Sequence, residues 1–180
     1  MKVICYGDSN TYGFDPRSYF GDRYPADARW VDLFAERTGW SVINAGENGR
    51  SIPRGAVPVP EDAERILVML GSNDLLQGAD AETTALRMEH FLRQLQVGKD
   101  RLLLIAPPPM QRGAWVPDDA LVDESLHLAE RYRMLAERIG IRFADACTWN
   151  VELAFDGVHF TENGHRAFAV GLYEFLQKGE

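Results

Sequence analysis

Four short polar segments, far apart in the chain, contain the residue types needed for nucleophilic attack on a carbonyl group. They are GDSN at residues 7–10, NAGENG at 44–49, GSND at 71–74 and DGVH at 156–159. Ser9 offers a hydroxyl nucleophile, which is weak unless a neighbouring base takes its proton. His159 is the candidate base, and Asp156 is the candidate carboxylate that orients it. The set indicates acyl-transfer chemistry through a Ser-His-Asp triad.

Attack on a carbonyl group also needs hydrogen-bond donors at the oxygen that becomes negatively charged. The candidates are the backbone N–H groups of Ser9 and Gly49 and the side-chain amide of Asn73. Two of these residues have a plainer alternative, because Ser9 could be a helix N-cap and Asn73 a turn residue. The chemical interpretation therefore depends on the combination of the four segments and not on any one of them.

Other residues give weaker signals. Three aromatic residues are candidates for the wall of a substrate pocket, although aromatic side chains near loops are more often part of the core; they are Tyr12, Trp115 and Phe160. No two histidines stand at metal-ligand spacing beside a cysteine or a carboxylate cluster, so we expect no metal site. No phosphate-binding or dinucleotide-binding glycine motif occurs, so we expect no cofactor.

Apolar runs alternate with helical patterns along the chain. Strands are predicted at residues 3–6, 41–45, 65–70, 101–106 and 141–144, and the last helix is predicted to begin with Thr161 as its N-cap. Nearly continuous apolar strands separated by helices predict an α/β fold with a parallel sheet covered on both faces. The functional residues follow strand ends, and loops at the carboxyl ends of parallel strands share one rim. We therefore expect the four segments to meet there.

Composition limits the classes of function. The 180 residues predict a single domain over residues 1–180, and 19 basic against 27 acidic residues give a net charge of −8. This charge disfavours nucleic acids and anionic membranes as partners. Cys5 and Cys147 are too few for a disulfide framework, and we expect two buried free thiols. With no signal-peptide pattern or transmembrane span in the sequence, we expect a cytoplasmic protein.

In order and approximate spacing, the four segments resemble those of the SGNH, or GDSL-type, hydrolase superfamily, over residues 7–163. The resemblance implies a flavodoxin-like, three-layer αβα fold with five parallel strands in the order 2-1-3-4-5. It implies that Ser9 is the nucleophile, that Gly49 and Asn73 help form the oxyanion hole, and that His159 and Asp156 are the base and its orienter. Asn10 departs from the name-giving motif, which has leucine there, and we expect this change to alter packing beneath the nucleophile.

Further likenesses, including the PPP segment at residues 107–109 and the DGVHFTE segment at 156–162, are similar to the arylesterase/acyltransferase and small acetylesterase group. That resemblance implies a small-molecule ester substrate and homo-oligomeric assembly. We expect a cofactor-free serine esterase that hydrolyses small, acetyl-type esters through an acyl-Ser9 intermediate. The alternatives are a carbohydrate deacetylase, a thioesterase or an acyltransferase with the same machinery, and, in another class, a binding module without catalysis.

Overall fold

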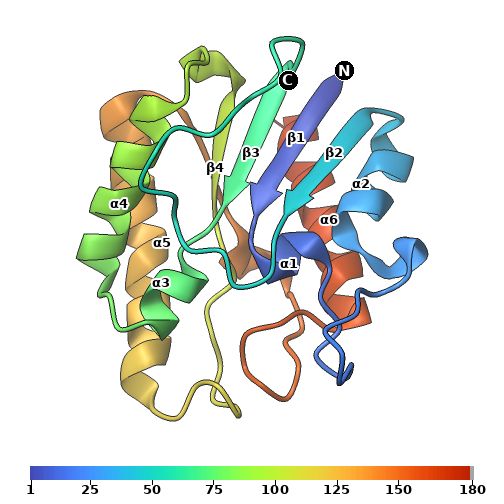
Figure 1. The fold of residues 1–180 in the computed structure, drawn as a ribbon, viewed down its shortest axis with the longest axis vertical. Helices are drawn as coiled ribbons and strands as arrows, with labels where there is room; N and C mark the ends of the chain where they lie inside the picture. Colours follow the sequence, from blue (N-terminus) through green and yellow to red (C-terminus); the bar gives the residue numbers. More distant parts are fainter. Residues whose placement is uncertain (179–180) are drawn as a thin grey trace.

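The computed structural model describes residues 1–178, in which one parallel sheet has helices on both faces (Figure 1). Its strands are β1 (Lys2–Gly7), β2 (Ser41–Gly46), β3 (Arg65–Met69), β4 (Leu102–Ala106) and β5 (Arg142–Asp145). They lie in the order β2-β1-β3-β4-β5, and every neighbouring pair is parallel. The predicted three-layer α/β fold and strand order are confirmed. Each strand begins and ends within one residue of its predicted bounds.

Helices α2 and α6 cover one face of the sheet, and α4 and α5 cover the other (Figure 1). The α-helices are α1 (Ser9–Tyr12), α2 (Trp30–Thr38), α3 (Ser72–Leu76), α4 (Ala81–Gln94), α5 (Asp119–Ile139) and α6 (Glu162–Lys178). Short 3₁₀ turns are η1 (Ala26–Ala28), η2 (Lys99–Arg101) and η3 (Ala146–Trp149). None of the helices within residues 1–178 combines the length and apolar composition needed to cross a membrane.

The central strand β3 shows how the sheet divides the core into two layers. Ile66 and Val68 pack in the cluster formed with α4 and α5, whereas Leu67 and Met69 pack in the cluster formed with α2 and α6. Successive side chains of a strand point to opposite faces, so an apolar run of this kind buries both faces. The continuous apolar pattern of β3 therefore corresponds to burial on both faces of the sheet.

Helix ends follow the capping chemistry of the sequence. The carboxylates of Asp80 and Asp118 accept backbone N–H groups in the first turns of α4 and α5. Thr161 Oγ1 accepts the N–H of Gly164 at 3.0 Å, so the predicted N-cap of the last helix is confirmed. Helices α2 and α5 end where a glycine adopts a left-handed conformation. These caps satisfy backbone groups that the helices themselves leave without partners.

The two cysteines have different surroundings. Cys5 is buried in β1, as expected, but Cys147 is exposed on η3. The prediction of two buried thiols is therefore wrong for Cys147. The physical reason is the tight 3₁₀ turn, in which Ala146 is the buried residue and its neighbour points outward.

The sheet brings three strand ends to the same level, which positions the loops that follow them. Gly7, at the end of β1, pairs in register with Gly46 of β2 and with Met69 of β3. Helix α1 lies directly against the end of β2. The contact is so close that a Cβ atom on Gly46 would overlap the backbone of Thr11 and Tyr12. Position 46 must therefore be a glycine for α1 to pack on β2 in this way.

Helix α1 begins with a buried carboxylate cap. Asp8 Oδ1 accepts the backbone N–H of Asn10 at 3.0 Å, and Asp8 is almost completely buried. Burial raises the pKa of the Asp8 carboxyl to about 6, although the Asn10 N–H and the nearby His159 act in the opposite direction. Asp8 is the cap, so Ser9 stands as the first residue of the helix with its hydroxyl free for another partner.

Replacing Gly46 by alanine is expected to lower the free energy of unfolding by about 1–3 kcal/mol, because the methyl group must displace the backbone of α1. Urea denaturation of the wild type and the variant measures this change. Gly55→Ala is the matched control, since a Cβ atom at Gly55 meets nothing within 4 Å. Equal midpoints for the two variants would contradict close packing of α1 on β2.

Asp8→Asn is expected to change the pH dependence of stability. The pKa of Asp8 is raised on folding, so the native state holds its proton more tightly and the stabilisation is lost as pH rises through about 6. Asparagine keeps the capping oxygen but does not titrate. From pH 4 to pH 7 the variant should therefore gain roughly 2–3 kcal/mol relative to wild type. Denaturation at both pH values measures the difference, and a constant difference would contradict the raised pKa.

Candidate functional site

The side chains of Ser9, His159 and Asp156 form a continuous chain of hydrogen bonds. Ser9 Oγ lies 2.9 Å from His159 Nε2, and His159 Nδ1 lies 2.8 Å from Asp156 Oδ2. All three residues are buried, although Ser9 and His159 are 150 positions apart in the chain. In this arrangement an imidazole can take a hydroxyl proton while a carboxylate holds the ring.

The Asp156 carboxylate is held in its ionised form by the turn that follows it. Its Oδ1 accepts the backbone N–H groups of Val158 and His159, both at 2.9 Å. Burial acts to raise the pKa of Asp156, but these hydrogen bonds and the one from the His159 ring outweigh it, so the pKa lies below its usual value. Gly157 adopts a positive φ of 83° within this turn, a conformation that favours glycine.

Two aromatic rings flank the imidazole of His159. The centroid of the Phe14 ring lies 4.6 Å from the centroid of the imidazole, with the two rings tilted. The centroid of the Trp115 ring lies 4.9 Å from it, with the rings edge to face. Trp115 is about half exposed and Phe14 is partly buried, so both rings that contact the imidazole are also accessible to solvent. No sequence motif assigned a role to Phe14. Its position on the loop after α1 was the only available signal, and that loop has no regular periodicity.

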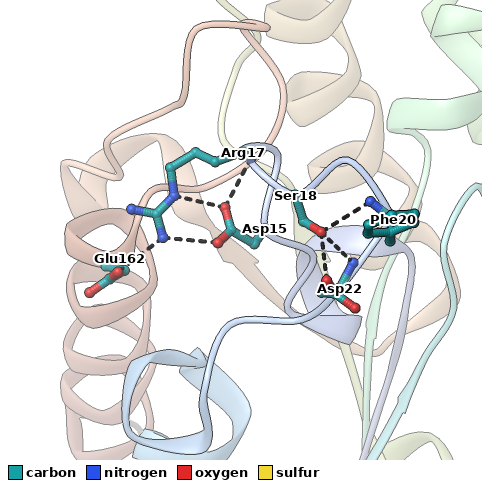
Figure 2. Close-up of polar contacts among 6 residues, drawn as sticks. All are labelled: Asp15, Arg17, Ser18, Phe20, Asp22 and Glu162. Carbon is teal, nitrogen blue, oxygen red and sulfur yellow. Dashed lines mark hydrogen bonds and ion pairs between the residues drawn. The ribbon is translucent and has the colours of Figure 1, made fainter.

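The loop that carries Phe14 is braced by polar contacts, which Figure 2 shows. Arg17 Nε donates to Asp15 Oδ1 at 2.9 Å, and Arg17 Nη2 donates to Glu162 Oε1 at 3.2 Å in the first turn of α6. The Ser18 hydroxyl donates to Asp22 Oδ2 at 2.8 Å, which closes the loop on itself. Hydrogen bonding to Arg17 lowers the pKa of Asp15. The loop is therefore tied to the helix that begins just after His159.

The Trp115 loop is attached to the segment that carries Asp156. Three backbone N–H groups of residues 111–115 donate to carbonyl groups of residues 155–157, at 3.0 to 3.1 Å. The two backbones approach so closely that a Cβ atom on Gly113 would overlap Asp156, and one on Gly157 would overlap Gln111. Part of the Pro107-to-Asp118 loop therefore packs on its own chain and fixes Trp115 beside His159.

The turn after β2 is attached to the end of β1 by Arg50. Arg50 Nη1 donates to Gly7 O at 2.9 Å, and its guanidinium lies over the Tyr6 ring, 4.3 Å from the ring centre. Asn73 Nδ2 donates to Arg50 O at 3.1 Å, so two candidate oxyanion donors belong to one connected unit. Gly49 has a positive φ of 72° in this turn. Arg50 is one of the residues similar to the arylesterase group, but the sequence alone assigned it no role.

Asp74, the residue after Asn73, connects the turn after β2 to α4. Asp74 is almost completely buried; its Oδ2 accepts the N–H of Ile52 at 2.9 Å and its Oδ1 pairs with Arg87 at 2.9 Å. The buried carboxylate thus has a cation and a backbone donor as partners, which a buried charge requires. Asp74 is therefore a brace for the loop.

Of the three predicted wall residues, Trp115 is the one that the structure places against His159. The prediction for Phe160 is wrong, because its side chain is about 1% exposed and packs on Phe168 in the core. Since strand alternation is absent from this turn, the sequence could not tell which way Phe160 points. Tyr12 is partly buried, with its ring beneath the guanidinium of Arg23 at 4.4 Å.

The remaining histidines lie apart from this chemistry. His165 is fully buried, its Nδ1 accepts the N–H of Trp30 at 3.3 Å, and burial lowers its pKa to about 3. His90 and His127 are exposed on α4 and α5. Within residues 1–178 there is no group of three or more His, Cys, Asp or Glu residues that could hold a metal ion.

Comparison with known proteins places this geometry in a family. The GDSL-like Lipase/Acylhydrolase family model matches residues 5–167, whereas a comparison with curated proteins gives no match. Among solved structures, a putative arylesterase from Agrobacterium tumefaciens str. C58 is 25% identical, with a TM-score of 0.82 over 98% of both chains. A carbohydrate acetylesterase family member from Sinorhizobium meliloti is 25% identical, with a TM-score of 0.81 over 98% of this chain and 97% of that chain.

The fold is also similar to that of the M. smegmatis aryl esterase, which is 23% identical with a TM-score of 0.83 over 98% of both chains. The family match spans most of the sequence and includes all the residues of the hydrogen-bonded chain and the candidate oxyanion donors. The chain therefore belongs to the GDSL-like lipase/acylhydrolase family, a family of carboxylic ester hydrolases.

Proposed function

We propose that this protein hydrolyses small carboxylic esters, acetyl esters in particular, through a covalent acyl-Ser9 intermediate. The single observation that carries the proposal is the chain of hydrogen bonds from Ser9 Oγ through both ring nitrogens of His159 to Asp156, at 2.9 and 2.8 Å. Such contacts turn a weak hydroxyl into a nucleophile, because the proton has an acceptor at the moment of attack.

The reaction has two halves that use the same base. In the first, Ser9 Oγ attacks the ester carbonyl carbon while His159 Nε2 takes the hydroxyl proton, and Nε2 then gives that proton to the departing alcohol. In the second, His159 takes a proton from water, the resulting hydroxide attacks the acyl-Ser9 carbonyl, and the proton returns to Ser9 as the acid leaves. Asp156 stays ionised throughout, which its lowered pKa supports, and it stabilises the imidazolium.

The negative charge of each tetrahedral intermediate is stabilised by the N–H groups of Ser9 and Gly49 and by the amide of Asn73. The amide nitrogen of Asn73 carries two hydrogens. One serves the contact with Arg50 O at 3.1 Å, and the second is left to reach a substrate oxygen. The Arg50 contacts with Gly7 and Asn73 support this role, since they hold the donor-bearing turn in place before substrate binds.

The proposed substrate class, an acetyl ester of an aryl alcohol or a sugar, rests on two considerations. The arylesterase and carbohydrate acetylesterase structures that resemble this chain are named for such activities. In addition, Trp115 and Phe14 border His159 and leave a flat aromatic edge against which an aryl or sugar leaving group can pack. A panel of acetylated sugars, thioesters and aryl esters separates the esterase from a deacetylase, a thioesterase and an acyltransferase.

Two further expectations stay predictions: assembly into a homo-oligomer and a cytoplasmic location. Light scattering coupled to size-exclusion chromatography measures the first, and fractionation of the producing cells measures the second. The alternative of a binding module without catalysis is addressed by labelling, since an active-site phosphonate reacts only with a serine that a base has activated.

The first prediction from this function concerns Ser9. Wild-type protein should hydrolyse p-nitrophenyl acetate, and Ser9→Ala should reduce the rate to near background because no covalent intermediate can form. Spectrophotometric assay measures the rates, and mass spectrometry measures phosphonate attachment to Ser9. Equal rates in the two proteins, with no label on Ser9, would favour the binding module.

The second prediction concerns Asn73. Removing its donor in Asn73→Ala should lower kcat by roughly 10²–10³-fold, the usual cost of losing one oxyanion donor. Gln77→Ala is the matched control, since it removes a hydrogen bond from the other end of the same short helix to the same loop, Gln77 Nε2 to Ser51 Oγ at 2.9 Å. The control should stay within about threefold of wild type, because exposed hydrogen bonds of this kind contribute little. A loss below about tenfold in Asn73→Ala would remove Asn73 from the oxyanion hole.

A further inference from the structure

We infer that Asn10 is a positioning residue that sets the place of His159 relative to Ser9, an inference that rests on the proposed function. Its side-chain amide makes two hydrogen bonds to the backbone on either side of His159. Asn10 Nδ2 donates to Val158 O at 3.1 Å, and Phe160 N donates to Asn10 Oδ1 at 2.9 Å. The base therefore lies between two backbone groups that are held by one planar amide.

The same residue belongs to the nucleophile's helix. Asn10 follows Ser9 directly in α1, and its own N–H donates to Asp8 Oδ1 at 3.0 Å. Asn10 is about 3% exposed, so both side-chain hydrogen bonds are shielded from water. A short, buried side chain thus spans two segments that lie about 150 positions apart in the sequence, and the Ser9-to-His159 contact lies alongside it.

The two hydrogen bonds of the Asn10 amide, to Val158 O and from Phe160 N, are called the Asn10 clamp below. They act on the backbone that carries the base. The side chain of His159 projects from the middle of the segment that Asn10 binds, and Ser9 is the residue next to Asn10. Any shift of the segment at residues 158–160 along α1 must first break one of the two amide hydrogen bonds. Because a displacement of about 1 Å between reacting groups costs on the order of 10²-fold in rate, the clamp protects the distance on which proton transfer depends.

Leucine, the residue of the name-giving motif at this position, branches at the same carbon as asparagine but carries two methyl groups in place of both polar groups. Asn10→Leu therefore keeps the branched outline of the side chain and leaves Val158 O and Phe160 N without the partners they have in this structure. The expectation that Asn10 changes only packing beneath the nucleophile is thus too narrow, because its amide contacts the segment that carries the base.

The test measures kcat and KM of Asn10→Leu for p-nitrophenyl acetate, at a temperature where thermal melting shows the variant to be folded. We expect kcat to fall by about tenfold or more, with KM within about threefold of wild type, because the reacting groups are misplaced while the substrate pocket is kept. The rate of phosphonate attachment to Ser9 should fall in parallel. A purely structural role would lower the melting temperature and leave kcat of the folded protein unchanged.

Trp30→Phe is the matched control. Trp30 Nε1 donates to Asn10 O at 2.9 Å, so this variant removes one buried hydrogen bond to the same residue and leaves the side-chain clamp in place. It should lose stability while its kcat stays within about threefold of wild type. A loss of kcat as large as that of Asn10→Leu would show that any destabilisation of α1 has this effect and would overturn the inference.

Asn10→Asp is the second variant, and it decides the matter if Asn10→Leu does not fold. It keeps the oxygen that accepts from Phe160 N and loses the donor to Val158 O, so a smaller loss of kcat than in Asn10→Leu is expected, still above about threefold. Full activity in the folded Asn10 variants, with Ser9→Ala inactive, would overturn only the positioning role. Full activity in Ser9→Ala would overturn the proposed function itself.

Discussion

The parallel pairing of β1 with both of its neighbours is the constraint from which the rest of the site follows. Gly7 lies in register with Gly46 and with Met69, so the chain leaves three adjacent strands at one level. Close contact between the last residues of α1 and the end of β2 then fixes the position of the helix that carries Ser9. A slip of β3 by one residue would exchange its side chains between the two faces of the sheet and so disrupt the packing of both core clusters.

The base and its carboxylate depend on a different kind of support. Asp156 and His159 lie in a turn between β5 and α6, outside the regular hydrogen bonding of sheet and helix. Backbone contacts from residues 111–115 hold one side of this turn, and the amide of Asn10 holds the other. An irregular segment thus gains a defined position from its neighbours, which suits a site whose groups must be placed to within a fraction of an ångström.

Two buried carboxyl groups near His159 show how local hydrogen bonding decides charge. Asp8 accepts one backbone N–H and its pKa rises to about 6 with burial. Asp156 is also buried, yet it accepts two backbone N–H groups and the His159 ring, and its pKa lies below the usual value. The hydrogen bond from the His159 ring and the two backbone donors together outweigh burial at Asp156, whereas one backbone donor does not at Asp8. The carboxylate that contacts the ring is the one that stays ionised.

Local patterns in the sequence determined the strands, the helix caps, the α/β class and the grouping of Ser9, Asp156 and His159, because apolar periodicity and residue chemistry are short-range properties. The resemblance to a known family supplied the strand order. Tertiary structure alone decided that Asn10 clamps the base, that Arg50 holds the Gly49 turn, and that Phe160 belongs to the core. Each of these outcomes depends on partners that are distant in sequence or on the direction of a side chain in an irregular turn. Contacts between distant residues and side-chain directions in irregular turns leave no periodic pattern in the sequence.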